Sequence, residues 1–222
     1  MERVSIFIDG GNFYYLVLKK LAVTEGSFDF HAFALFLTGS RHIVSRRYYV
    51  GTVRERQGDE KSRLRVASQV RYLALLRNAG WETKTSRLRR RIEEVVIDQR
   101  VEDYQKLQSM GIRSIKFERM REKGIDVKLA TDIMMGAVDD QYDTAILISS
   151  DADLIPAIDW VRGRFKKKVE YVGFSFPNDS NPETATRPLL SLIARSDVQR
   201  ILTKQDLLSF VRDKRVDFNA VF

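Results

Sequence analysis

Short apolar runs alternate along the chain with segments in which apolar positions recur at helical spacing. The runs that predict buried strands lie at residues 3–8, 43–53, 144–148 and 169–172. Helical spacing or a helix cap predicts helices at residues 12–21, 29–36, 59–78, 127–138 and 153–164. Strands and helices in alternation are typical of βαβ units that form a parallel sheet. We therefore predict an α/β fold with a mostly parallel central sheet.

The alternation is interrupted after the helix predicted at residues 59–78. The apolar stripe of this helix consists of Leu64, Ala67, Val70, Leu73 and Leu76. Residues 84–113 then fit neither period, and we interpret them as a basic insertion that is either helical or a hairpin. The pattern predicts one domain over residues 1–200 that carries this insertion. A helix capped by Thr203 is expected in a C-terminal helical tail over residues 201–222.

The composition narrows the classes of protein and site. Cysteine is absent and only two histidines occur, so any bound metal is expected to have oxygen ligands. The net charge is +8, and clustered basic residues favour a polyanionic partner; the alternative is a solvated surface that thirty carboxylates balance. We find no apolar run long enough for a membrane span and no signal peptide pattern, so we expect no membrane partner and a cytoplasmic location.

Aspartates follow two of the predicted buried strands. Asp9 comes directly after the first strand, and Asp151 and Asp153 follow the strand at 144–148. Because the carboxyl ends of parallel strands meet at one edge of a sheet, we expect these three side chains to converge. Asp126, at the start of a helix, can join them, and Asp132 in the same helix is a possible fifth member.

Clustered carboxylates repel one another unless a positive charge joins them. Mg²⁺ or Mn²⁺ takes oxygen ligands and can activate water and orient a phosphate. Asn12, Ser149 and Ser150 are placed to hydrogen-bond an aspartate, a metal-bound water or a phosphate. Gly10 and Gly11 would let the backbone approach a bulky substrate.

Each aspartate also has a purely structural interpretation. Asp153 and Asp126 are as well placed to cap helices as to bind metal. Asp132 can instead face solvent or Lys128. The metal hypothesis depends on the coincidence of two strand ends and one helix start, each with an acid.

Three motifs in this order resemble the NYN domain (LabA/DUF88 type) of the PIN-like nuclease superfamily. They are Ile8-Asp9-Gly10-Gly11-Asn12, Lys123-Gly124-Ile125-Asp126-Val127 continuing to Asp132, and the segment from Tyr142 to Asp153. The resemblance covers most of the chain, from Val4 to about Gly173. Two features depart from the family pattern: Ser149-Ser150-Asp151 stands where the family usually has Ser-Gly-Asp, and residues 84–113 look longer and more basic.

The resemblance implies a three-layer α/β/α PIN-like (Rossmann-like) fold and a metal-dependent ribonuclease. In that picture Asp9, Asp126, Asp151 and Asp153 are catalytic and bind Mg²⁺ or Mn²⁺, with Asp132 as a further ligand. The residues that would contact single-stranded RNA are Asn12, Lys123, Ser149, Ser150, Arg89, Arg90 and Arg91. The insertion would then grip RNA or serve self-association, and a homodimer is a reasonable expectation.

Two other functions compete with this hypothesis. The same fold can bind RNA or a protein without cutting, although retention of the four principal aspartates argues against that. An aspartate-nucleophile phosphatase would use Asp151 or Asp153, but it also needs a lysine and a second acidic motif downstream, and no clear pair follows Lys168.

Overall fold

The central sheet is parallel, as the apolar runs predict. The computed structural model describes residues 1–53, 55, 58–121, 124–178 and 184–212. Within these residues six strands form one sheet in the order β3-β2-β1-β6-β7-β8, and every neighbouring pair is parallel. The strands are β1 (Arg3–Asp9), β2 (His42–Thr52), β3 (Glu82–Arg87), β6 (Thr144–Ile148), β7 (Lys168–Ser175) and β8 (Val198–Thr203).

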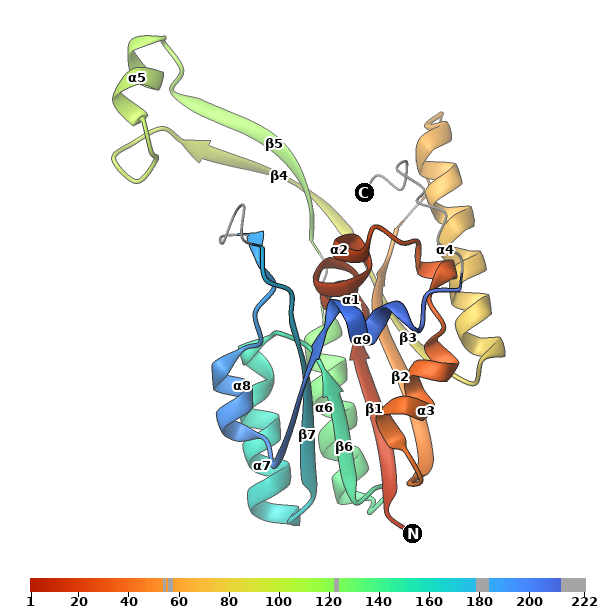
Figure 1. Cartoon of the computed structure of the whole chain (residues 1–222). Helices are drawn as coiled ribbons and strands as arrows, with labels where there is room; N and C mark the ends of the chain where they lie inside the picture. The colour runs from red at the N-terminus through yellow and green to blue at the C-terminus, as the bar shows by residue number, and fades with distance from the viewer. Residues whose placement is uncertain (54, 56–57, 122–123, 179–183, 213–222) are drawn as a thin grey trace.

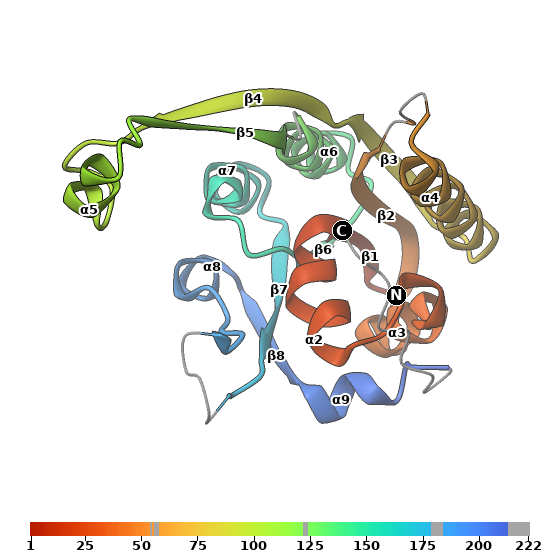
Figure 2. The ribbon, with the colours of Figure 1, turned by 90° about the horizontal axis from the view of Figure 1, so that it is seen from above.

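Helices cover both faces of this sheet, which confirms the predicted three-layer α/β/α architecture (Figures 1 and 2). One face carries α1 (Gly10–Phe13), the π-helical turn η1 (Tyr14–Leu18), α2 (Lys19–Leu21), the short turn η2 (Glu25–Ser27), α3 (Phe30–Thr38), α4 (Glu60–Asn78) and α9 (Lys204–Leu208). The other carries α6 (Ile125–Val138), η3 (Ala152–Leu154), α7 (Ile155–Phe165) and α8 (Leu190–Arg195). Successive strand residues point to opposite faces, so Ile6 and Ile8 enter one apolar core and Phe7 the other.

An aspartate caps α4, but the buried stripe of this helix differs from the prediction. Asp59 accepts a hydrogen bond from Ser62 N at 3.1 Å and caps α4. Leu73 and Leu76 are buried as expected, whereas Leu64 is 56% and Val70 60% exposed. Apolar spacing alone does not say which of several apolar stripes on a long helix faces the core.

The chain continues the domain past residue 200. β8 crosses the predicted boundary at residue 200 as an edge strand of the central sheet. Thr203 and Asp206 form a capping box that starts α9, as predicted, and Leu207 is buried in the core. Residues 201–212 are therefore packed against the sheet. The last ten residues of the predicted tail, 213–222, lie outside the described residues.

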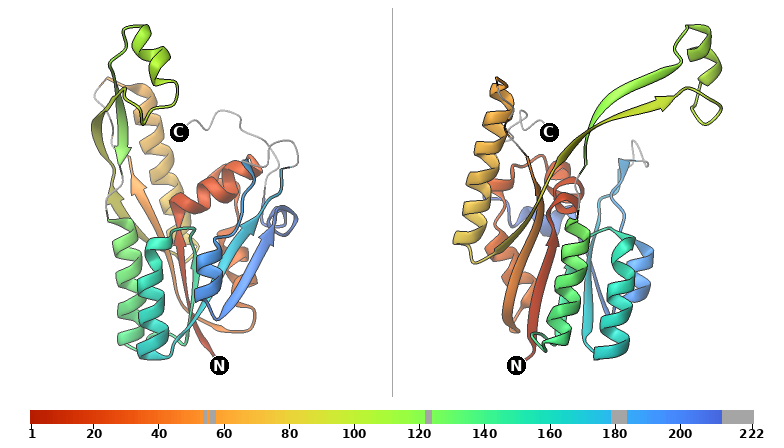
Figure 3. Two further views of the ribbon diagram at one scale, coloured as in Figure 1. Left: turned by 90° about the vertical axis from the view of Figure 1, so that its left-hand side faces the viewer. Right: turned by 180° about the vertical axis from the view of Figure 1, so that it is seen from behind.

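A hairpin projects from the domain in the region of the predicted insertion. β3 belongs to the central sheet, so the projecting segment begins later than residue 84. It consists of β4 (Arg89–Val96) paired antiparallel with β5 (Ser114–Arg121), with α5 (Tyr104–Ser109) at the tip. Figure 3 shows this arm standing away from the layers. Among the described helices, none is long and apolar enough to cross a membrane.

Candidate functional site

The two strands that end in aspartates lie side by side at the centre of the sheet. From β1 the sheet extends through β2 and β3 on one side and through β6, β7 and β8 on the other. The strand order therefore reverses between β1 and β6, and ligands of parallel α/β sheets bind beyond the carboxyl ends of strands at such a point. Asp9 ends β1, and the segment Ser149–Asp151 follows β6 directly.

Asp9 is held in place by three hydrogen bonds. Its Oδ1 accepts from Asn12 N at 3.0 Å, and its Oδ2 accepts from Asn12 Nδ2 and from Ser149 Oγ, the latter at 3.3 Å. The residue is only 5% exposed, and this burial raises the pKa of Asp9 although the hydrogen bonds oppose it. The negative charge of Asp151 raises the pKa of Asp9 further.

The serines after β6 connect Asp9 to Asp151. Ser150 Oγ donates to Asn12 Oδ1, and Ser149 Oγ accepts from Asp151 N at 3.1 Å. Asp151 in turn caps η3 by accepting from Asp153 N at 2.9 Å. Asn12 and both serines thus position the aspartates; their predicted contact with substrate stays a prediction.

Asp126 reaches the same region from the start of α6. Gly124 precedes the helix with a positive φ of 87°, which places Asp126 in its first turn. Partial burial raises the pKa of Asp126, and so do the negative charges of Asp9, Asp151 and Asp153. The four principal aspartates therefore act on one another electrostatically. Lys123, predicted to contact substrate, lies outside the described residues.

Asp132 is anchored by a tyrosine that the sequence did not single out. Tyr49 Oη donates to Asp132 Oδ2 at 2.7 Å, and Tyr49 lies beside Asp9 in the β1–β2 register. Lys128 does not pair with Asp132 but donates to Thr85 O at 2.6 Å. The charges that raise the pKa of Asp126 are those of the other three aspartates, so Asp132 as a metal ligand stays a prediction.

Gly10 packs closely against a core tyrosine beside Asp9. Gly10 is buried, and a Cβ at this position would overlap the ring of Tyr48. A Cβ on Gly11 would lie 3.4 Å from Asp9 Oδ1. The missing side chain of Gly10 therefore lets β1 turn into α1 against Tyr48; the predicted approach of the backbone to substrate stays a prediction.

The chemistry of the four aspartates fits a hard divalent cation. Their ligand atoms are all carboxylate oxygens, and the charge interactions recorded for Asp9 and Asp126 come from other carboxylates. As they stand, however, no three acidic or histidine side chains of the described residues are close enough together to hold a metal ion. The four side chains therefore have the donor type for a metal but, as they stand, not the spacing.

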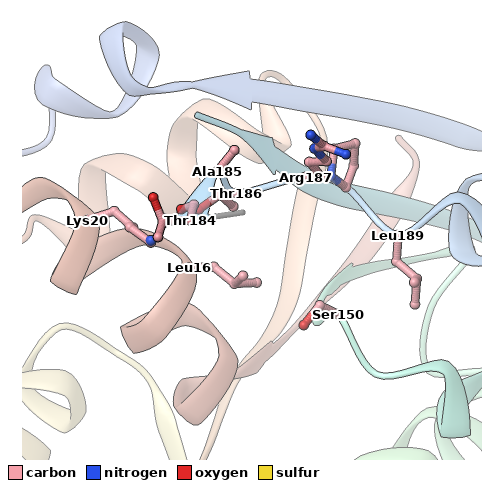
Figure 4. Close-up of a pocket in the computed structure, with 9 residues that line it drawn as sticks. Leu16, Lys20, Ser150, Thr184, Ala185, Thr186, Arg187 and Leu189 are labelled. Atoms are coloured by element: carbon pink, nitrogen blue, oxygen red, sulfur yellow. Dashed lines mark hydrogen bonds between the residues drawn. The ribbon is translucent and has the colours of Figure 1, made fainter. Parts of the chain in front are cut away.

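A pocket of about 720 Å³ opens beside Ser150 (Figure 4). Lys20, at the end of η1–α2, lies on one side of it and Arg187, before α8, on the other. Lys20 Nζ donates to Thr184 O at 2.6 Å, which ties α2 to the segment that precedes α8. Lys20 and Arg187 are 167 positions apart and belong to no motif, so only the fold could bring them to one pocket.

The predicted basic contacts are on the arm. Arg91 is exposed on β4, and the side chains of Arg89 and Arg90 lie outside the described residues. Their predicted contact with RNA stays a prediction.

The fold is similar to solved structures. A protein of unknown function, VPA0982 from Vibrio parahaemolyticus, is 21% identical with a TM-score of 0.53, and the match covers 90% of this chain and 93% of that one. A putative UDP-N-acetylglucosamine 2-epimerase from Listeria monocytogenes matches at 11% identity over 96% of this chain and 43% of that one, with a TM-score of 0.35. The first likeness supports the fold alone, and the second is too weak to support an argument. Among curated proteins, none matches this sequence at a significant level.

The family is shown by the match of the NYN domain to residues 3–190. That range contains β1 to β7, the arm and all four principal aspartates. NYN domains are PIN-like and typically nucleases, which generally use divalent metals. This chain belongs to the NYN domain family.

Proposed function

We propose that the protein is a metal-dependent ribonuclease that hydrolyses phosphodiester bonds of single-stranded RNA at the acidic cluster. The observation that carries the proposal is the position of four aspartates at the carboxyl edge of a parallel sheet, where the strand order reverses. Three structural elements supply them, and their charges raise the pKa of Asp126. Carboxylates whose pKa values are raised by neighbouring negative charges, as those of Asp9 and Asp126 are, mark a candidate functional site.

Asp9, Asp126, Asp151 and Asp153 would hold Mg²⁺ or Mn²⁺. The bound metal would supply an activated water and stabilise the departing oxygen. Asn12 and Ser149 keep the Asp9 carboxylate oriented through their hydrogen bonds. By analogy with the family, we expect products with 5′-phosphate and 3′-hydroxyl ends.

The pocket beside Ser150 is the proposed path for the RNA backbone. Its volume of about 720 Å³ is enough for a nucleotide-sized group. Lys20 and Arg187 place positive charge there, next to an acidic cluster that would otherwise repel the phosphates. The metal and these two cations together would offset that repulsion.

The test is cleavage of labelled single-stranded RNA by the purified protein with Mg²⁺ or Mn²⁺. EDTA and the Asp151→Asn variant should each abolish cleavage. Asp139→Asn is the matched control, because Asp139 is an exposed aspartate at the opposite, amino edge of the sheet. Cleavage that persists in EDTA or in Asp151→Asn would contradict the proposal.

A second candidate is a module that binds RNA without cutting it. It is favoured by the spacing of the aspartates, since no three described acidic or histidine side chains are close enough together to hold a metal as they stand. If this candidate is right, the protein should bind RNA equally well with and without metal and in the Asp151→Asn variant. Retention without cleavage, by a preparation that circular dichroism shows to be folded, would support it over the nuclease.

A further inference from the structure

The projecting arm exposes apolar side chains on both of its faces. We define the outer arm as residues 92–118, which include most of β4 and β5 and all of α5. The register places Val95, Ile115 and Phe117 on one face, and Ile92 and Val96 on the other. The exposed fractions of its large apolar side chains are 69% for Ile92, 40% for Val95, 56% for Val96, 66% for Met110, 45% for Ile115 and 39% for Phe117.

An isolated two-stranded ribbon is at best marginally stable in water. At the tip, Ile97 is buried and Gln108 Nε2 donates to Ile97 O at 2.8 Å, so α5 covers the end of the ribbon. The apolar residues nearer the domain have no such cover, because each of them is at least 39% exposed. Exposed apolar surface of this kind marks an interaction site.

The charge of the outer arm indicates what partner it fits. It has four Lys or Arg and six Asp or Glu, a net charge of −2, in a chain of net charge +8. The rest of the chain therefore carries +10. Within the outer arm, Lys116 pairs across the strands with Glu94 at 3.6 Å, and Arg119, at the base of the arm and outside this count, pairs with Glu93 at 3.6 Å. An acidic surface disfavours RNA and favours a basic protein surface.

This chain offers such a surface along α4. The helix has five Lys or Arg and one Glu, a net charge of +4. A groove of about 520 Å³ runs beside it, lined in part by Val23, Val53, Leu64 and Leu75 and by the basic residues Arg65 and Arg71. Leu64 is 56% and Leu75 55% exposed, so the groove is apolar and open, and its charged lining consists of Arg65, Arg71 and one acid, Glu25. It complements the outer arm in both polarity and charge.

We propose that the outer arm of one copy packs into the α4 groove of a second copy. The arm and α4 lie on opposite sides of the carboxyl edge of the sheet, as Figure 1 shows. Seen from above, both lie in the same half of the molecule (Figure 2). A two-fold axis across that edge places each arm against the groove of its partner. Both contacts then form at once, which gives a closed dimer.

The first test is the mass of the purified protein by light scattering after gel filtration, without RNA or metal. The wild-type protein should be a dimer. Ile115→Ser with Phe117→Ser, on the arm, and Leu64→Ser with Leu75→Ser, in the groove, should each give monomers. Val138→Ser is the matched control, because this valine is 46% exposed at the end of α6, near the amino edge, and should leave the dimer intact. Circular dichroism checks that each variant is folded.

A charge exchange tests which surfaces meet. Glu94→Lys with Glu102→Lys on the arm, or Arg65→Glu with Arg71→Glu on α4, should weaken self-association at least tenfold, and low salt should accentuate the loss. In a mixed dimer of the two variants both contacts pair opposite charges, so the pair should associate more tightly than either variant alone. The measurement is the dissociation constant from sedimentation equilibrium.

Two outcomes would overturn the inference. One is a monomeric wild-type protein at every concentration. The other is arm variants that remain dimeric but lose RNA retention, which would identify the arm as an RNA grip. Because mass is measured without RNA or metal, this test does not depend on the proposed nuclease function.

Discussion

Aspartates lie at both edges of the central sheet, but their surroundings differ. Those at the amino edge form ion pairs, whereas those at the carboxyl edge lie near other carboxylates. At the amino edge, Arg3 Nη2 lies 2.7 Å from Asp143 Oδ1 and 3.0 Å from Asp140 Oδ1. Lys167 also pairs with Asp140. Hydrogen bonds from Arg3 hold the pKa of Asp143 at about 2, below its usual value. These carboxylates bind cations of the chain itself, as expected for loop carboxylates.

At the carboxyl edge the aspartates interact with polar groups and with one another. Burial raises the pKa of Asp9, and burial with the charges of three other carboxylates raises that of Asp126. At the amino edge, where the aspartates serve structure, Arg3 and Lys167 form ion pairs with them. Among the described residues no ion pair joins a Lys or Arg to the four aspartates of the carboxyl edge, and this difference is a better guide to function than the number of acids.

The largest expected effect is a difference in the rate of RNA cleavage between substitutions at the two edges. Asp9→Asn should lower RNA cleavage by roughly 100-fold or more, because it removes a buried ligand oxygen from the proposed metal site. Asp140→Asn, the same substitution at the amino edge, should change the rate less than about twofold. Initial rates on one labelled RNA at saturating Mn²⁺ provide the measurement. Equal losses in both variants would remove the distinction between the edges.

The sequence predicts the cluster at the carboxyl edge, because that cluster depends on strand periodicity. Asp9 and Asp151 could be placed together because each follows a buried strand and parallel strands share a carboxyl edge. Only the second half of strand β8, from residue 201, was assigned to a tail; the strand was not recognised because its edge position leaves polar residues such as Gln199 and Arg200 between its apolar ones. The arm was interpreted as an insertion that is either helical or a hairpin, and the structure shows a hairpin with a short helix at its tip.

Contacts between distant segments could not be predicted. Tyr49 meets Asp132 across 83 positions, and nothing near either residue indicates the other. Lys20 and Arg187 belong to no basic run, and the fold alone brings them to one pocket. Such contacts depend on how helices pack on the sheet, which local periodicity does not determine.

Metal binding should stabilise only the protein with an intact carboxyl edge. At about 100 times the dissociation constant, Mn²⁺ should add about 2.7 kcal/mol to the free energy of unfolding, or about 5–10 °C in Tm. Asp126→Asn should lose most of this gain, whereas Asp143→Asn should keep it. Differential scanning fluorimetry with Mn²⁺ and with EDTA measures the difference. A gain that survives in Asp126→Asn would place the metal elsewhere.

The basic side of the site should affect binding more than chemistry. Lys20→Ala and Arg187→Ala should each raise KM for RNA roughly tenfold, as expected for loss of a charged phosphate contact, with little change in kcat. The slope of log KM against log salt should fall by about 1 for each residue. Lys167→Ala, which removes a cation from the amino edge, is the control and should change neither quantity. A loss confined to kcat would instead place Lys20 or Arg187 at the reacting phosphate.

The smallest effect is an opposite change in stability at the two edges, measured in EDTA. At pH 7, Asp126→Asn should raise Tm because it removes a carboxylate that three others repel. Asp143→Asn should lower Tm because the ionised Asp143 is stabilised by Arg3. Both groups are partly exposed, so each change should be at most about 1 kcal/mol, or about 1–4 °C.

The stabilising effect of Asp143 at the amino edge should decrease at low pH. The pKa of Asp143 is about 2 in the folded protein, below the ordinary value of 3.8, so its stabilising contribution is complete above about pH 4. The contribution is lost as the pH falls from about 4 towards about 2. The Tm difference between wild type and Asp143→Asn should therefore be constant from pH 7 to 5 and shrink below pH 4. A difference that stayed constant down to pH 3 would mean that Asp143 acts through packing rather than charge, and the electrostatic contrast between the edges would then rest on Asp9 and Asp126 alone.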